Sequence, residues 1–222
     1  MSTESKTRKL LKNEWVKTAI MIAIVVIAFF TFWYGIRFAL ATDYPMLAVA
    51  SGSMEPTLNV GDLIIVHGIS NASDIYTHLA VVDSQTGNIV GGGDIIIFHT
   101  YLPGGQNINP GHPDELIVNR AINKTFNNVT GVWYFTTKGD ANPYGPGLQS
   151  AESTSPDFWR VPENYIVGKV VGVAPYVGNI PLYIRTTNGI ITVIVLIILV
   201  LCVEMLYSSF KEKRKLPAEA QS

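Results

Sequence analysis

The chain has 222 residues, of which 48% are hydrophobic and only 15% are charged, well below the roughly 25% of ordinary soluble domains. Its formal net charge of −1 gives no reason to expect a nucleic-acid partner. The single cysteine, Cys202, excludes an intrachain disulfide, and the four histidines lack metal-ligand spacing, so we expect no metal and no cofactor.

The first expected element is a membrane-spanning helix over residues 18–38. Residues 18–36 (TAIMIAIVVIAFFTFWYGI) contain no charged side chain. At about 1.5 Å per residue they extend roughly 28 Å, which is enough for a bilayer core. The stretch is longer than the apolar part of a cleaved signal peptide, and aromatic residues crowd its far end. We therefore interpret it as an uncleaved anchor.

A short glycine-containing turn, Ser51-Gly-Ser53-Met54-Glu-Pro56, follows this helix. Two hydroxyls at positions i and i+2, followed by a chain-stiffening proline, can hold a serine Oγ exposed beside backbone N–H groups. Nucleophilic catalysis requires that arrangement. Serines also simply form turns, so this pattern is weak evidence by itself.

The chain beyond the turn is predicted to be mainly β. Short β-branched or apolar runs alternate there with Gly, Pro, Asn and Asp clusters, as expected for hairpins and barrel-like sheets. The uninterrupted apolar run at 95–98 predicts a strand that is buried on both faces. We expect strands at 63–66, 80–83, 94–99, 116–122, 132–137 and 165–173, and loops at 103–113 and 142–162.

A second membrane-spanning helix is predicted over residues 186–207, because residues 189–203 (GIITVIVLIILVLCV) are uniformly apolar. Basic residues precede the first helix and follow the second, so the positive-inside rule places both termini in the cytoplasm. Three glycosylation sequons, at Asn71, Asn123 and Asn128, agree with an external middle region. The expected organisation is a basic tail (1–17), a helix (18–38), an external β domain (41–182), a helix (186–207) and a second tail (208–222).

Five ordered blocks resemble the type I signal peptidase family, most closely its archaeal and endoplasmic-reticulum branch. Together they are far more specific than any one alone. The blocks are SGSMEPTLNVGDLIIV (51–66), GGGDIIIFH (91–99), LIVNRAI (116–122), YFTTKGDANP (134–143) and VPENYIVGKVVGVAPYVG (161–178).

The resemblance implies a role for several residues. Ser53 corresponds to the nucleophile, and Ser51 to a position that helps to build the oxyanion hole. Met54 and Pro56 correspond to residues that shape the turn and the substrate groove. Two acids complete the implied site: Asp140 in the Lys-Gly-Asp turn, and Asp157 as a candidate for a second aspartate of the family.

Asn119 departs from the family pattern. Related sequences of this branch place His immediately before Arg in the third block, and bacterial members place Lys, whereas this chain has Asn119-Arg120. An amide cannot accept the proton of a serine hydroxyl near neutral pH. Three explanations stay open: another base, with His99 and Lys138 as candidates; a catalytically silent relative; or an Asn that replaces a native His.

The family resemblance implies a membrane-bound serine endopeptidase that cleaves N-terminal signal peptides from secreted preproteins. The alternative is a silent homologue that binds signal peptides or assists another protein. The implied partners are preproteins, the lipid bilayer and the secretion translocon. The short two-anchor layout favours an archaeal plasma membrane, with the β domain outside.

Overall fold

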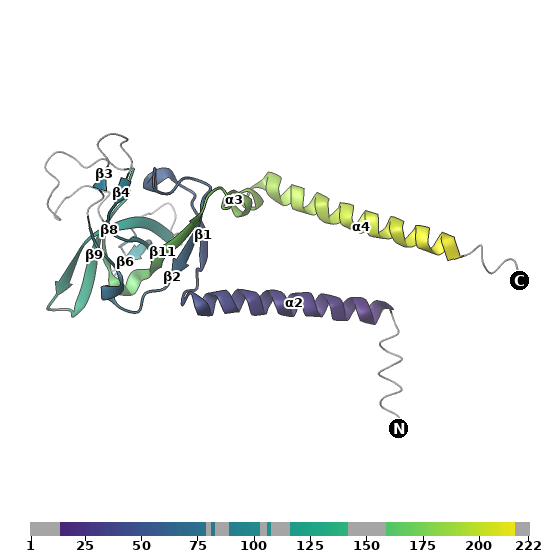
Figure 1. Ribbon diagram of the computed structural model, residues 1–222, viewed down its shortest axis with the longest axis horizontal. Coiled ribbons are helices and arrows are strands. Elements are labelled where there is room, and N and C mark those ends of the chain that lie inside the picture. Colours follow the sequence, from purple (N-terminus) through teal and green to yellow (C-terminus); the bar gives the residue numbers. More distant parts are fainter. Residues whose placement is uncertain are drawn as a thin grey trace, which may run out of the picture.

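The structure, a computed structural model, describes residues 14–78, 81–82, 89–102, 106–107, 116–141 and 159–215. Its centre is a curled antiparallel sheet of seven strands in the order β1-β2-β11-β5-β8-β9-β10 (Figure 1). Those strands are β1 (Met46–Ala48), β2 (Leu63–His67), β5 (Ile95–His99), β8 (Leu116–Asn127), β9 (Val132–Lys138), β10 (Trp159–Pro162) and β11 (Ile166–Ala174).

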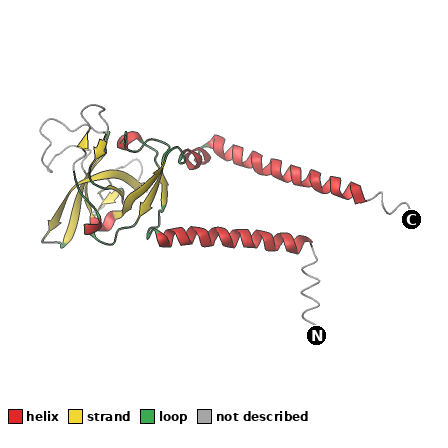
Figure 2. Cartoon of the chain, in the orientation of Figure 1, coloured by secondary structure: helices red, strands yellow, loops and turns green. Residues whose placement is uncertain are grey.

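Smaller elements complete the β-rich domain. Two short hairpins pair β3 (Val81–Val82) with β4 (Ile89–Gly91) and β6 (Tyr101–Leu102) with β7 (Gln106–Asn107). The 3₁₀ turns are η1 (Gly52–Met54), η2 (Ala72–Asp74) and η3 (Glu163–Tyr165), and the helices are α2 (Glu14–Ala39), α3 (Asn179–Arg185) and α4 (Thr187–Lys215). The expected fold class, mainly β between two apolar helices, is confirmed (Figure 2).

The core forms two clusters on opposite faces of the sheet. Strand β5 contributes to both, because successive side chains of a strand point to opposite faces. The first cluster contains Ala72, Ile75, Ile96, Phe98, Ala121, Phe135 and Val161. The second contains Val49, Met54, Leu58, Ile64, Val66 and Ile97. The prediction that the apolar run of β5 is buried on both faces is thus confirmed.

Replacing Phe98 with Ala is expected to lower the free energy of unfolding by about 3–5 kcal/mol, because it removes a fully buried ring from the first cluster. Phe126→Ala is the matched control, since that ring is 47% exposed and the same truncation leaves no comparable cavity. Thermal melts of both variants in one detergent provide the measurement. Equal shifts in Tm would contradict the position of Phe98 in the core.

The two long helices could each cross a membrane. The candidate spans are Val16–Ala39 in α2, with a mean hydropathy of 2.4, and Thr187–Tyr207 in α4, with a mean hydropathy of 3.0. Their apolar side chains are exposed rather than packed inside the protein, unlike those of a soluble core helix. Both helices leave the β-rich domain on the same side (Figure 1). One bilayer could therefore hold both helices and leave the β-rich domain on one of its faces.

The prediction of a loop over residues 142–162 is wrong at its C-terminal end. Residues Trp159–Pro162 form β10, which pairs with β9 and buries Val161 in the first cluster. Proline cannot donate to a strand ladder, and β10 accordingly lies at an edge of the sheet, where Pro162 is tolerated. Strand β7 also lies inside the loop predicted at 103–113. The other parts of both predicted loops are outside the described residues.

Candidate active site

Ser53 lies in η1, which follows the edge strand β1 along the chain and precedes β2. Met54 fixes this turn, because its side chain is buried in the second cluster. Ser53 is half-buried, and its Oγ lies 3.4 Å from the exposed Oγ of Ser51. Pro56 is exposed just after the turn. The structure thus brings the two predicted hydroxyls together at the surface of a packed turn.

A second turn, Lys138-Gly139-Asp140, begins at the last residue of β9 and meets the first. The backbone N–H of Ala141 donates a hydrogen bond to the backbone C=O of Ser53, at 3.0 Å. Ser53 and Ala141 are 88 positions apart in the chain, so this bond joins two distant segments. The turn predicted to carry the supporting acid therefore lies directly beside the turn predicted to carry the nucleophile.

A buried ion pair holds these two turns together. The guanidinium of Arg120 contacts both carboxylate oxygens of Asp140, with Nε–Oδ1 at 2.8 Å and Nη2–Oδ2 at 2.5 Å. The two side chains are only 7% and 1% exposed. The Thr57 hydroxyl donates to Oδ2 of Asp140 at 2.7 Å, and Arg120 Nη1 donates to the Gly93 carbonyl at 2.7 Å.

This network satisfies the buried charges and links three separate segments of the chain to the residues after Ser53. Sequence reasoning missed Thr57 and Gly93 as members of the network. Thr57 directly follows Pro56 in the first block, and Gly93 closes the glycine run of the second. Only their presence inside recognised blocks could have drawn attention to them.

Asn119 lies on β8, is 4% exposed, and pairs with Ile96 of β5. Strand alternation places the Asn119 side chain on the face of the first cluster and the Arg120 side chain on the face that carries Met54. Strand β8 as a whole packs against η1.

The alternative bases lie in different places. His99 pairs with Leu116, and Ile95 pairs with Arg120. Those pairs are four residues apart, which is about 13 Å at roughly 3.3 Å per residue. The His99 ring instead contacts Tyr44. His99 therefore lies too far along the sheet to share a proton with a group beside Arg120.

Lys138, by contrast, lies directly across from Arg120 in the β8–β9 ladder. It is almost fully buried, and its Nζ donates to the Gly139 carbonyl at 3.3 Å. It belongs to the same turn that bonds to Ser53 through Ala141. Asp157, the second predicted aspartate, lies outside the described residues.

Comparison with known proteins identifies the family. No protein-family model matches the chain. The signal peptidase complex catalytic subunit SEC11 of Schizophyllum commune is 31% identical over 170 residues, covering 72% of this chain and 75% of the relative. The chain belongs to the SEC11 signal peptidase family.

Two further SEC11 proteins extend the comparison. The protein from Tuber melanosporum is 26% identical over 177 residues, covering 79% of this chain and 82% of the relative. The protein from Lachancea thermotolerans is 23% identical over 155 residues, covering 70% of this chain and 74% of the relative. The family resemblance drawn from the five blocks is thus confirmed. All three SEC11 relatives are fungal, so an archaeal source stays a prediction.

Proposed function

We propose that the chain is the catalytic subunit of a signal peptidase, a membrane-anchored serine endopeptidase that removes signal peptides from secreted preproteins. The observation that carries this proposal is the hydrogen bond between the Ser53 carbonyl and Ala141. It holds the nucleophile turn against the turn of Asp140. The names of the SEC11 relatives support the same activity.

The proposed chemistry begins with Ser53 Oγ attacking the scissile carbonyl. The hydroxyl of Ser51 and nearby backbone N–H groups stabilise the resulting oxyanion. Collapse of the intermediate forms an ester to Ser53 and releases the mature protein with a new amino terminus. Water then hydrolyses the ester and releases the signal peptide. Asp140 supports the site by holding Arg120 and Thr57 in place.

The substrate is proposed to bind as an extended strand beside β1. This strand is at an edge of the sheet and leads within a few residues to Ser51. An edge strand has unpaired backbone groups that an extended peptide can bond. Small residues at the −1 and −3 positions of the signal peptide would then enter shallow pockets near Ser53, beside Met54 and Pro56.

The proton of Ser53 needs an acceptor that Asn119 cannot provide. Of the two alternative bases, Lys138 belongs to the turn that bonds to Ser53 through Ala141, whereas His99 lies farther along the sheet; a lysine acts as a base only in its neutral form. Asn119 also favours a second candidate function: a silent homologue that holds signal peptides without cutting them.

The membrane arrangement is part of the proposal. Both termini are placed in the cytoplasm and the β-rich domain on the external face, where a preprotein's cleavage site emerges. The plasma membrane, the translocon and partner subunits are proposed as its surroundings. The word "complex" in the SEC11 names supports the partner subunits.

Ser53→Ala is expected to abolish cleavage of a model preprotein by the purified full-length chain, because the ester cannot form. Ser51→Ala is expected to slow cleavage by about 10²–10³, the usual cost of losing one oxyanion donor. Ser70→Ala, at an exposed serine of the β2–η2 loop, is the control and is expected to cleave at the normal rate. Product analysis by mass spectrometry gives the rates and the cleavage position.

Each result has a clear meaning. Cleavage that survives Ser53→Ala would refute the serine mechanism. A wild-type chain that binds the preprotein without cutting it would instead support the silent homologue.

A further inference from the structure

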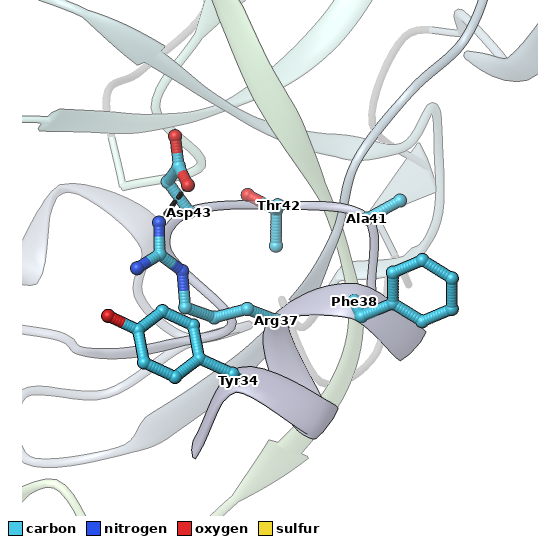
Figure 3. Close-up of a pocket in the computed structure, with 6 residues that line it drawn as sticks. All are labelled: Tyr34, Arg37, Phe38, Ala41, Thr42 and Asp43. Carbon is cyan, nitrogen blue, oxygen red and sulfur yellow. Dashed lines mark hydrogen bonds and ion pairs between the residues drawn. The ribbon is translucent and has the colours of Figure 1, made fainter. Parts of the chain in front are cut away.

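A pocket lies where α2 ends and the chain turns into the β-rich domain (Figure 3). Its volume is about 670 Å³, and it is open on one side. The last turns of α2 form one wall and the linker to β1 forms the other. The residues that line it are Tyr34, Arg37, Phe38, Ala41, Thr42 and Asp43. It is separate from the Ser53 site.

The linker wall is firmly attached to the sheet. The N–H of Gly68 at the end of β2 donates to the Leu40 carbonyl at 2.8 Å. A side chain on Gly68 would meet the Ala41 carbonyl oxygen at 2.0 Å, so only glycine allows this approach. Thr42 is buried, and its hydroxyl accepts from the N–H of Tyr44. Ala41 adopts a left-handed φ of 50°, which the surrounding contacts maintain.

Two opposite charges lie side by side at one side of the pocket (Figure 3). The Arg37 guanidinium pairs with the Asp43 carboxylate and lies 5.7 Å from the centre of the Tyr34 ring. Figure 3 shows these three side chains together on one side of the pocket. The Arg37 and Asp43 side chains are 31% and 77% exposed, so both charges stay open to a ligand.

The position of the pocket relative to the membrane span indicates which molecules surround it. The apolar span of α2 ends at Ala39, two residues beyond Arg37 and one beyond Phe38. If α2 crosses a bilayer, as the proposed function requires, the pocket lies at the level of the lipid head groups. Phe38 is almost fully exposed there, beside the apolar surface of α2.

We propose that this pocket binds a membrane phospholipid whose head group carries both a phosphate and an ammonium group. The planar guanidinium of Arg37 matches a phosphate and can bond two of its oxygens. The ammonium would contact the Asp43 carboxylate, with the Tyr34 ring face close by. The acyl chains would extend along α2 past Phe38. A purely anionic head group would instead meet repulsion from Asp43.

This site couples the anchor to the domain that carries Ser53. The lipid would contact α2 through Arg37 and the sheet-attached linker through Asp43. An occupied pocket would therefore fix the angle between the helix and the sheet. An exposed ion pair alone holds two segments together only weakly, so a bound lipid would strengthen this junction.

The test uses the full-length chain in nanodiscs that contain equal parts of phosphatidylethanolamine and phosphatidylglycerol. After release into mild detergent, native mass spectrometry identifies the lipid that stays bound. We expect retained phosphatidylethanolamine, and a loss of about tenfold or more in Arg37→Gln and in Asp43→Asn. Arg185→Gln, at an exposed arginine at the end of α3, is the matched control and should retain the lipid.

Three other outcomes would overturn the proposal. The first is equal retention by wild type and both pocket variants, which leaves Arg37 and Asp43 as a simple ion pair. The second is preferential retention of phosphatidylglycerol that rises in Asp43→Asn, which indicates an anion site. The third is retention of soluble phosphoethanolamine to the same extent without a bilayer, which indicates a small-molecule site. The readout is lipid binding, so a failed cleavage assay would leave this result intact.

Discussion

Replacing Asn119 with His is expected to raise the rate of signal-peptide cleavage by about 10²–10⁴, the usual contribution of a positioned general base. Asn119 is buried on β8 beside Arg120, and β8 packs against η1. The family resemblance makes this the position of the base for Ser53, and an imidazole can accept a hydroxyl proton, whereas the present amide cannot. The rate of the variant should increase with pH through about 6.5, as the imidazole loses its proton.

Single-turnover cleavage of a model preprotein at several pH values measures this effect. Asn123→His, the same change four positions along the same strand, is the matched control and should leave the rate unchanged. Adding Ser53→Ala to Asn119→His should abolish the gain. No gain in Asn119→His would mean that the side chain at this position does not reach Ser53. The test is sharp because strand alternation places the Asn119 side chain on the face of the first cluster, opposite the face of Met54 and η1, whereas the family pattern makes this position the base.

Lys138→Met separates the open explanations. If Lys138 is the base of the wild-type chain, the single variant should lose cleavage. The double variant with Asn119→His should cleave, which also shows that the chain folds without the lysine. If the wild-type chain is silent, Asn119→His alone should create activity.

The helices and the centre of the sheet were predictable from the sequence for simple reasons. An uncharged run long enough for a bilayer is rare in soluble domains, so α2 and α4 stood out. The uninterrupted run in β5 indicated burial on both faces, which the two clusters explain. Strand β10 escaped notice because it is four residues long, ends in proline, and follows a polar stretch of sequence. Strand β1 has only three residues and no alternation to detect.

The candidate site was only partly predictable. The motif residues Ser51, Ser53 and Asp140 came from the order of the blocks, and the structure places their turns in contact. The contact itself depends on how the sheet curls, which the sequence of either turn does not reveal. The same is true of Thr57 and Gly93, whose roles depend on the position that the Arg120 guanidinium reaches in the folded chain. Long-range hydrogen bonds to ordinary residues leave no local pattern.

Loss of the Asp140 carboxylate is expected to destabilise the chain by about 3–5 kcal/mol, the usual cost of leaving one member of a buried ion pair without its partner. In Asp140→Ala the guanidinium of Arg120 stays buried but loses its two charged contacts. The hydroxyl of Thr57 also loses its acceptor. The turn that bonds to Ser53 would then lose its side-chain contacts with Arg120 of β8, so substrate cleavage should fall together with stability.

The control for this prediction is an exposed ion pair of the same kind. Asp43→Ala, measured in lipid-free detergent, removes the partner of Arg37 and should cost no more than about 1 kcal/mol. The double variant Arg120→Met with Asp140→Leu should be more stable than Asp140→Ala, since it leaves no unpaired buried charge. Chemical denaturation of all three variants provides the comparison. If Asp140→Ala costs no more than Asp43→Ala, the buried pair is not what holds the Ser53 turn in place.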